Sequence, residues 1–109
     1  MLVLTAEERI VKKIEKRGGK VTRDENAPGK PVVRVDLRFT EVTDAGLKEL
    51  KELKSLERLN LNDTRVTDAG LKELKELKSL QTLGLGGTQV TDAGVKELQA
   101  AQPGLEIIR

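Results

Sequence analysis

The 109-residue chain contains no cysteine, histidine, tryptophan or tyrosine. The lack of cysteine excludes a disulfide framework and a thiol nucleophile, and the lack of histidine removes the commonest general base and metal ligand. Phe39 is the one aromatic residue, so the core must consist of Leu, Val, Ile and Ala. An enzyme is therefore the least favoured class, and we expect no catalytic residue, metal site or cofactor.

Charge and hydropathy narrow the range of partners. Charged residues make up 35% of the chain, yet the net charge is only +2, too small to indicate nucleic-acid binding without aromatic stacking platforms. No apolar run approaches the ~20 residues that span a bilayer, and residues 1–4 are too short for the apolar part of a signal peptide. We therefore expect no nucleic-acid or membrane partner, and a chain that is either cytoplasmic or the mature form of an exported protein.

What the sequence does contain is a strict internal repeat. The stretch VTDAGLKELKELKSL begins at Val42, returns at Val66 and starts a third time, as VTDAGVKEL, at Val90. A period of 24 residues predicts stacked copies of one supersecondary unit, with a single core running through the stack.

Each copy contains a strand signal followed by a helix signal. Leu59 and Leu61 alternate along one strand, so both side chains should point inward. Three later leucines recur at roughly helical spacing and predict the inward side of a helix: Leu71, Leu74 and Leu77.

A Thr-Asp-Ala-Gly motif joins strand to helix in every copy. In the middle copy, Thr67 is placed to cap the helix N-terminus, and Asp68 adds negative charge at the positive end of that helix. Gly70 costs ~1 kcal/mol relative to Ala inside a helix, so we expect close backbone packing there. The Thr64 hydroxyl should satisfy a backbone group in the turn after the strand. Helix capping is favoured over a calcium ladder of Asp residues, because clustered oxygen ligands are lacking.

Aligned on the period, each unit has the pattern L-x-x-L-x-L-x-x-T-x-V followed by T-D-A-G-L-x-x-L. This pattern resembles the leucine-rich repeat, with Thr in the place usually given to Asn or Cys, over residues 32–109. Its second half is similar to the bacterial repeats akin to the cysteine-containing repeats of F-box proteins. The resemblance implies an α/β fold: a right-handed solenoid with a concave parallel β-sheet and convex helices. It also implies a protein–protein interaction module.

Residues 1–31 predict a different unit ahead of the repeats. Thr5-Ala-Glu-Glu8 is a capping box that should start a helix. The segments Lys20–Arg23 and Val32–Leu37 predict the strands of a β-hairpin around a turn-rich loop. We expect this helix and hairpin strand to cover the N-terminal end of the repeat core, giving one domain overall.

The third copy departs from the pattern. Ala101 takes the place of Leu77, and the segment 102–105 carries one extra residue before the last strand. Counted with that insertion, Ile107 should lie beside Thr82. No capping unit follows, so the last strand is expected to keep an unpaired edge.

Projected from the period, the outward side chains form three columns on the concave face. The first column is Arg34, Arg58, Thr82 and Ile107; the second is Asp36, Asn60, Gly84 and Arg109; the third is Arg38, Asn62 and Gly86. Unlike the core, these residues differ between repeats, which recognition of a partner would produce and unconstrained drift would produce equally. If a partner binds, we expect arginines 34, 38 and 58 to carry most of the binding, because Arg is enriched at hot spots.

Several alternatives stay open or are disfavoured. The chain could instead dimerise through its C-terminal strand, by Ile107 and Ile108, or it could be a consensus-like scaffold with no specific partner. Phe39 could anchor a partner, although packing against the N-terminal hairpin is favoured. The run 84–87 superficially resembles a phosphate-binding loop, but it lacks the following Lys-Ser or Lys-Thr and falls on a strand.

Overall fold

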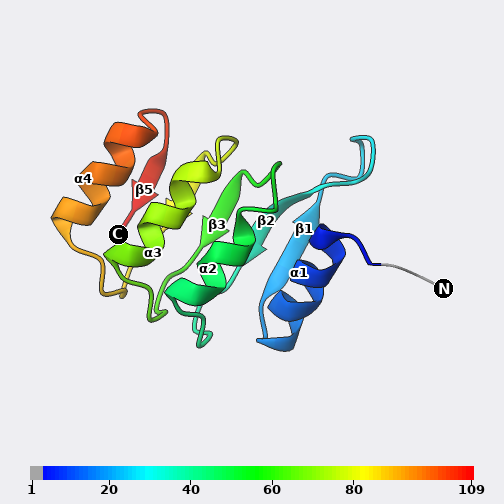
Figure 1. Ribbon diagram of the computed structural model, residues 1–109, viewed down its shortest axis with the longest axis horizontal. Helices are drawn as coiled ribbons and strands as arrows, with labels where there is room; N and C mark the ends of the chain where they lie inside the picture. The colour runs from blue at the N-terminus through cyan, green and yellow to red at the C-terminus, as the bar shows by residue number, and fades with distance from the viewer. Residues whose placement is uncertain (1–3) are drawn as a thin grey trace.

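The computed structural model describes residues 4–109, which form a five-stranded sheet with helices over one face (Figure 1). The elements in chain order are α1 (Ala6–Lys16), β1 (Lys20–Arg23), β2 (Val32–Asp36), α2 (Asp44–Leu50), β3 (Arg58–Asn60), α3 (Asp68–Glu73), the 3₁₀ helix η1 (Leu74–Glu76), β4 (Thr82–Gly84), α4 (Asp92–Ala101) and β5 (Glu106–Ile108). The strands follow one another in chain order, with β1 antiparallel to β2 and the remaining pairs parallel. The first three residues, which belong to the predicted N-terminal unit and to the segment considered for a signal peptide, lie outside the described residues.

The N-terminal helix begins with the capping box that the sequence predicts. The Thr5 backbone N–H donates to Glu8 Oε1 at 3.1 Å, and the Glu8 N–H donates to Thr5 Oγ1 at 3.1 Å. The hydrogen bonds from Thr5 are the main reason that the pKa of Glu8 lies below its ordinary value. The apolar face of α1 is buried through Ile10, Val11 and Ile14.

Strand and helix leucines meet in one aliphatic cluster that runs from α1 to Leu105. Leu59 and Leu61 are 2% and 0% exposed, which confirms the predicted inward strand positions. The predicted inward helix positions are also buried: Leu71, Leu74 and Leu77. At the end of the strand, the Thr64 hydroxyl donates to the Leu61 carbonyl at 2.7 Å, and the equivalent threonines of the neighbouring repeats make the same bond.

The parallel register keeps the 24-residue period from β2 through β5, because the paired residues of neighbouring strands are 24 positions apart in every case. Ile107 pairs with Leu83 of the core row and is half-buried, so the expected pairing of Ile107 with Thr82 is wrong by one residue. The extra residue is absorbed before the strand, because the Leu105 N–H donates to the Gln102 carbonyl at 3.1 Å and β5 starts directly afterwards. Glu106 therefore takes the place predicted for Ile107.

The last helix also differs from its predecessors. Its ten residues continue to Ala101, whereas α3 ends at Glu73 and passes into η1. The extra helical turn leaves Ala101 exposed and buries Gln102, whose Nε2 donates to the Leu74 carbonyl at 2.7 Å. The expectation that Ala101 replaces the buried Leu77 is therefore wrong.

Phe39 lies in a left-handed turn after β2. Its φ is 61°, and the equivalent residues Asp63 and Gly87 have φ values of 57° and 71°. Phe39 is 76% exposed, so the favoured packing against the N-terminal hairpin is wrong. The physical reason is that β1 pairs only with residues of β2, which ends three positions earlier at Asp36.

Candidate functional site

The strands collect polar side chains on the sheet face opposite the helices, which we call the concave face. A groove of about 400 Å³ is hollowed into this face. Most of the residues predicted for partner binding line it: Arg34, Asp36, Arg58, Asn60, Asn62, Thr82 and Gly84. The groove is also lined by Ile108, whereas the predicted Arg38 and Gly86 are not among its lining residues.

Two lining residues come from β1 and escaped the sequence analysis. Lys20 pairs with Asp36, and Thr22 pairs with Arg34, across the antiparallel hairpin. Directly opposed residues of an antiparallel pair face the same side of the sheet. The sequence predicted the hairpin but not its register. The register is what adds Lys20 and Thr22 to the columns of the concave face.

The acidic residue of the groove is already paired. Arg38 contacts Asp36 with its guanidinium, at 3.0 Å from Nη2 to Oδ2, and its backbone N–H donates to Asp36 Oδ1 at 3.0 Å. Partial burial opposes ionisation of Asp36, but the hydrogen bonds from Arg38 outweigh it and hold the pKa of the carboxyl below its ordinary value. Asp36 is thus a carboxylate at neutral pH whose charge Arg38 offsets.

The basic residues of the groove, unlike its acidic residue, are not paired with an opposite charge among the described residues. Lys20, Arg34 and Arg58 are exposed, and none of them forms an ion pair within residues 4–109. Arg34 and Arg58 are register partners on adjacent parallel strands. The groove therefore carries uncompensated positive charge at its N-terminal side.

The asparagines of the groove use part of their side chains to support the sheet. Asn60 Oδ1 accepts from the Asn62 N–H at 3.0 Å, and Asn62 Oδ1 accepts from the Gly86 N–H at 2.8 Å. A β-carbon at Gly84 would approach both amide oxygens to about 3.0 Å. Because Gly84 has no side chain, the two amides fit beside it, and no side chain fills the groove at this position of β4.

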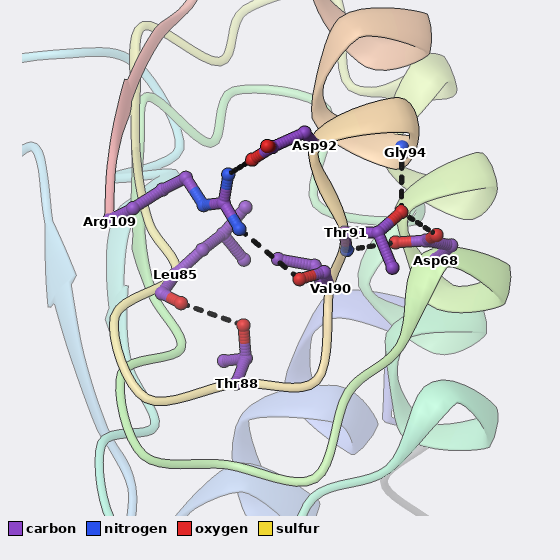
Figure 2. Close-up of polar contacts among 8 residues, drawn as sticks. All are labelled: Asp68, Leu85, Thr88, Val90, Thr91, Asp92, Gly94 and Arg109. Atoms are coloured by element: carbon purple, nitrogen blue, oxygen red, sulfur yellow. Dashed lines mark hydrogen bonds and ion pairs between the residues drawn. The ribbon is translucent and has the colours of Figure 1, made fainter.

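A clamp between repeats explains the Thr-Asp-Ala-Gly motif (Figure 2). The Asp68 carboxylate accepts from the Thr91 N–H at 2.8 Å and from the Thr91 hydroxyl at 2.6 Å, one repeat further along the chain. Asp44 makes the same two bonds to Thr67, at 2.8 and 2.6 Å. A β-carbon at Gly94 would overlap the Asp68 carboxylate, so glycine is required for the clamp to close. We name this the Asp–Thr–Gly clamp.

The clamp adds to the roles predicted for these residues. Thr67 and Thr91 accept from the N–H groups of Ala69 and Gly94 and so cap their own helices, as predicted for Thr67. The hydrogen bonds from Thr91 hold the pKa of Asp68 below its ordinary value. The sequence assigned Asp68 to its own helix, whereas the structure also bonds it to the next one.

The last repeat closes differently. Asp92 lies where the next clamp would form, and Arg109 pairs with its carboxylate and donates to the Val90 carbonyl at 3.3 Å (Figure 2). Arg109 was expected in the second concave column beside Gly84, but Ile108 holds that place. That expectation is wrong because the inserted residue is absorbed before β5 rather than within it.

Neither a metal site nor a membrane-spanning helix is found in the part of the chain that the structure describes. Within residues 4–109 no group of three or more His, Cys, Asp or Glu side chains is arranged to hold a metal ion. None of the described helices combines the length and the apolar character needed to cross a bilayer.

Comparison with known protein families gives three consecutive matches to one model, described as Leucine Rich repeat. The matched segments are residues 31–51, 52–75 and 76–98, which together make up more than half of the chain. A search among curated proteins found no match.

Proposed function

The chain belongs to the leucine-rich repeat family, whose repeats are generally protein-interaction modules, and we propose that its concave face binds a protein partner. One observation carries the proposal. The core and the Asp–Thr–Gly clamp are repeated almost unchanged, while the groove is lined by side chains that differ from strand to strand. The family is typically non-enzymatic, which fits a role in binding.

The mechanism that we propose is rigid presentation. Buried leucines hold each strand from behind, and the clamp ties each helix to the next at its N-terminus. Side chains on strands fixed in this way lose little conformational freedom on association, which favours binding. A groove of about 400 Å³ accommodates a short segment of a partner rather than a whole protein surface.

The proposal is tested by selecting binders from a random peptide library on the immobilised protein. Selected peptides are then measured against Thr82→Trp, which fills the groove, and against Glu76→Trp on the exposed side of η1. Both variants introduce Trp. Thr82 is half-buried in the groove, whereas Glu76 is exposed away from it, so the second variant controls for the added side chain. We expect binding to be lost with Thr82→Trp and kept with Glu76→Trp.

Failure to select any peptide that Thr82→Trp blocks would contradict the proposal. That result would leave self-association and a consensus-like scaffold without a specific partner as the two alternatives.

Self-association is a second candidate, because β5 is the outer strand on the C-terminal side of the described sheet. Ile108 is 53% exposed, whereas Ile107 packs against the core, so Ile108 is the side chain with which to test the hypothesis. Light scattering over a hundredfold concentration range should show a dimer that Ile108→Lys abolishes. A monomer throughout would contradict it.

We also propose finer assignments within the family. The VTDAGL sequences support the bacterial type of repeat similar to those of F-box proteins, and with it a right-handed solenoid. The burial of the α1 apolar face in the common core supports a capping role for residues 1–31.

A further inference from the structure

Two unpaired arginines lie side by side on the concave face. Arg34 on β2 and Arg58 on β3 are register partners, and adjacent strands lie ~4.8 Å apart. Like charges directly opposite one another in a sheet are destabilising. The sequence therefore maintains a local repulsion that a bound anion would relieve.

No described carboxylate fills this role. Asp36 is held by Arg38, and Glu106, which lies in the same column as Arg58, is separated from it by β4. On the helical side, Lys13 pairs with Glu49 at 3.0 Å and Lys75 with Glu97 at 2.8 Å, whereas Lys48 and Lys96 form no ion pair within residues 4–109. What distinguishes Arg34 and Arg58 is therefore their side-by-side placement in one column of the groove, where Lys20 adds a further positive charge.

We propose that the Arg34–Arg58 pair binds two carboxylates of an acidic, extended segment of a partner protein, carried by residues two positions apart and therefore on the same side of that segment. The inference rests on the proposed binding function of the concave face and specifies the chemistry of the segment that binds there. A guanidinium group donates several N–H hydrogen bonds in a planar fork that matches a carboxylate, so each arginine can bind one carboxylate of the segment.

The rest of the groove favours an apolar residue beyond the acidic pair. Glu106 lies two strand spacings from Arg58 and Ile108 two residues further along β5, so the diagonal from Arg58 to Ile108 is about 12 Å, which an extended chain covers in about four residues. Gly84 and the exposed Ile108 provide an apolar surface there. The preferred segment therefore has two acidic residues two positions apart and, about four residues after the second, an apolar one, so that all three side chains lie on the same side.

The experiment is an NMR titration of the ¹⁵N-labelled protein with two peptides, Gly-Glu-Gly-Glu-Gly-Gly-Gly-Leu-Gly and the same sequence with Gln for both Glu. We expect the Glu peptide to shift the amide signals of β2 and β3 and to bind at least about tenfold more tightly than the Gln peptide, as charge-assisted hydrogen bonds require. A DNA oligonucleotide of seven nucleotides is titrated in parallel.

Two double variants with equal net charge are compared. Arg34→Gln with Arg58→Gln removes the proposed site, whereas Lys48→Gln with Lys96→Gln removes two exposed charges from the helical side. The first variant should lose the preference for the Glu peptide and the second should keep it. All four positions are exposed, so thermal unfolding should confirm that both variants fold.

Equal binding of the two peptides, or equal loss in both double variants, would overturn the inference. So would binding of the oligonucleotide at least as tight as that of the Glu peptide, because the site would then be a general polyanion site. If library peptides still occupy the groove while the Glu peptide does not, only this inference fails. If nothing is blocked by Thr82→Trp, the proposed function fails with it.

Discussion

Replacement of Gly94 by Ala should have opposite effects on stability in two backgrounds. Gly94 lies in the first turn of α4, where Ala is favoured over Gly by up to ~1 kcal/mol. In the native protein, however, the added methyl group would overlap the Asp68 carboxylate and push it away from Thr91. Overpacking of this kind typically costs about 1–3 kcal/mol, so the net change should be a loss of roughly 0–2 kcal/mol.

Removal of the obstructing Asp68 side chain should reverse the sign of the stability change caused by Gly94→Ala. The atoms that a β-carbon at Gly94 would meet most closely all belong to Asp68. With Asp68→Ala already in place, Gly94→Ala should therefore raise the free energy of unfolding by up to ~1 kcal/mol. The double-mutant cycle isolates the contact, because the two residues are direct neighbours.

The assay is urea unfolding of the native protein, both single variants and the double variant, followed by circular dichroism. Gly104→Ala is the matched control, since nothing among the described residues lies within 4 Å of a β-carbon there. A Gly94→Ala variant that is more stable than the native protein by as much as it is in the Asp68→Ala background would refute the clamp.

Three further predictions concern the core, the turn and the clamp. Leu61→Ala should lower the free energy of unfolding by about 2–5 kcal/mol, because its fully buried side chain would leave a cavity; an unchanged urea midpoint would show that Leu61 is not buried. Phe39→Gly should raise stability by about 1 kcal/mol, because it relieves a left-handed backbone while removing little buried surface, and a lower melting temperature would contradict this. Asp68 should titrate below its ordinary pKa of about 3.9, so its stabilising contribution is complete above that pH and is lost as the pH falls through the lowered pKa. Thr91→Ala should move the pKa of Asp68 back up in an NMR titration; no movement would exclude Thr91 as the cause.

Much of the fold was predictable because the period is strict. Leu59 and Leu61 repeat every 24 residues, so each strand must present the same inward side chains as its neighbours. That constraint determines the register from β2 to β4, and with it the side-by-side placement of Arg34 and Arg58. The capping box at Thr5 could also be predicted from the sequence, because its two hydrogen bonds join residues only three positions apart.

The candidate site was predictable only where the leucines of the sequence are spaced by the period. Lys20 and Thr22 enter the groove through an antiparallel hairpin outside the repeats, whose register no repeated position indicates. At the other end, one inserted residue could be absorbed either in the turn or in β5, and hydrogen bonding of Leu105 to Gln102 decides for the turn. That choice places Ile108, rather than Ile107 or Arg109, on the concave face.

Spacings within one copy were enough to predict the repeat unit, its inward leucines and the order of strand and helix. The Asp–Thr–Gly clamp, in which Asp68 accepts hydrogen bonds from Thr91 across 23 residues, could be recognised only in the folded protein. A repeat shows that Asp, Thr and Gly occur together in each copy, but not that the Asp of one copy meets the Thr and Gly of the next. That meeting depends on how closely successive helices stack, a distance set by the packing of the leucines beneath them.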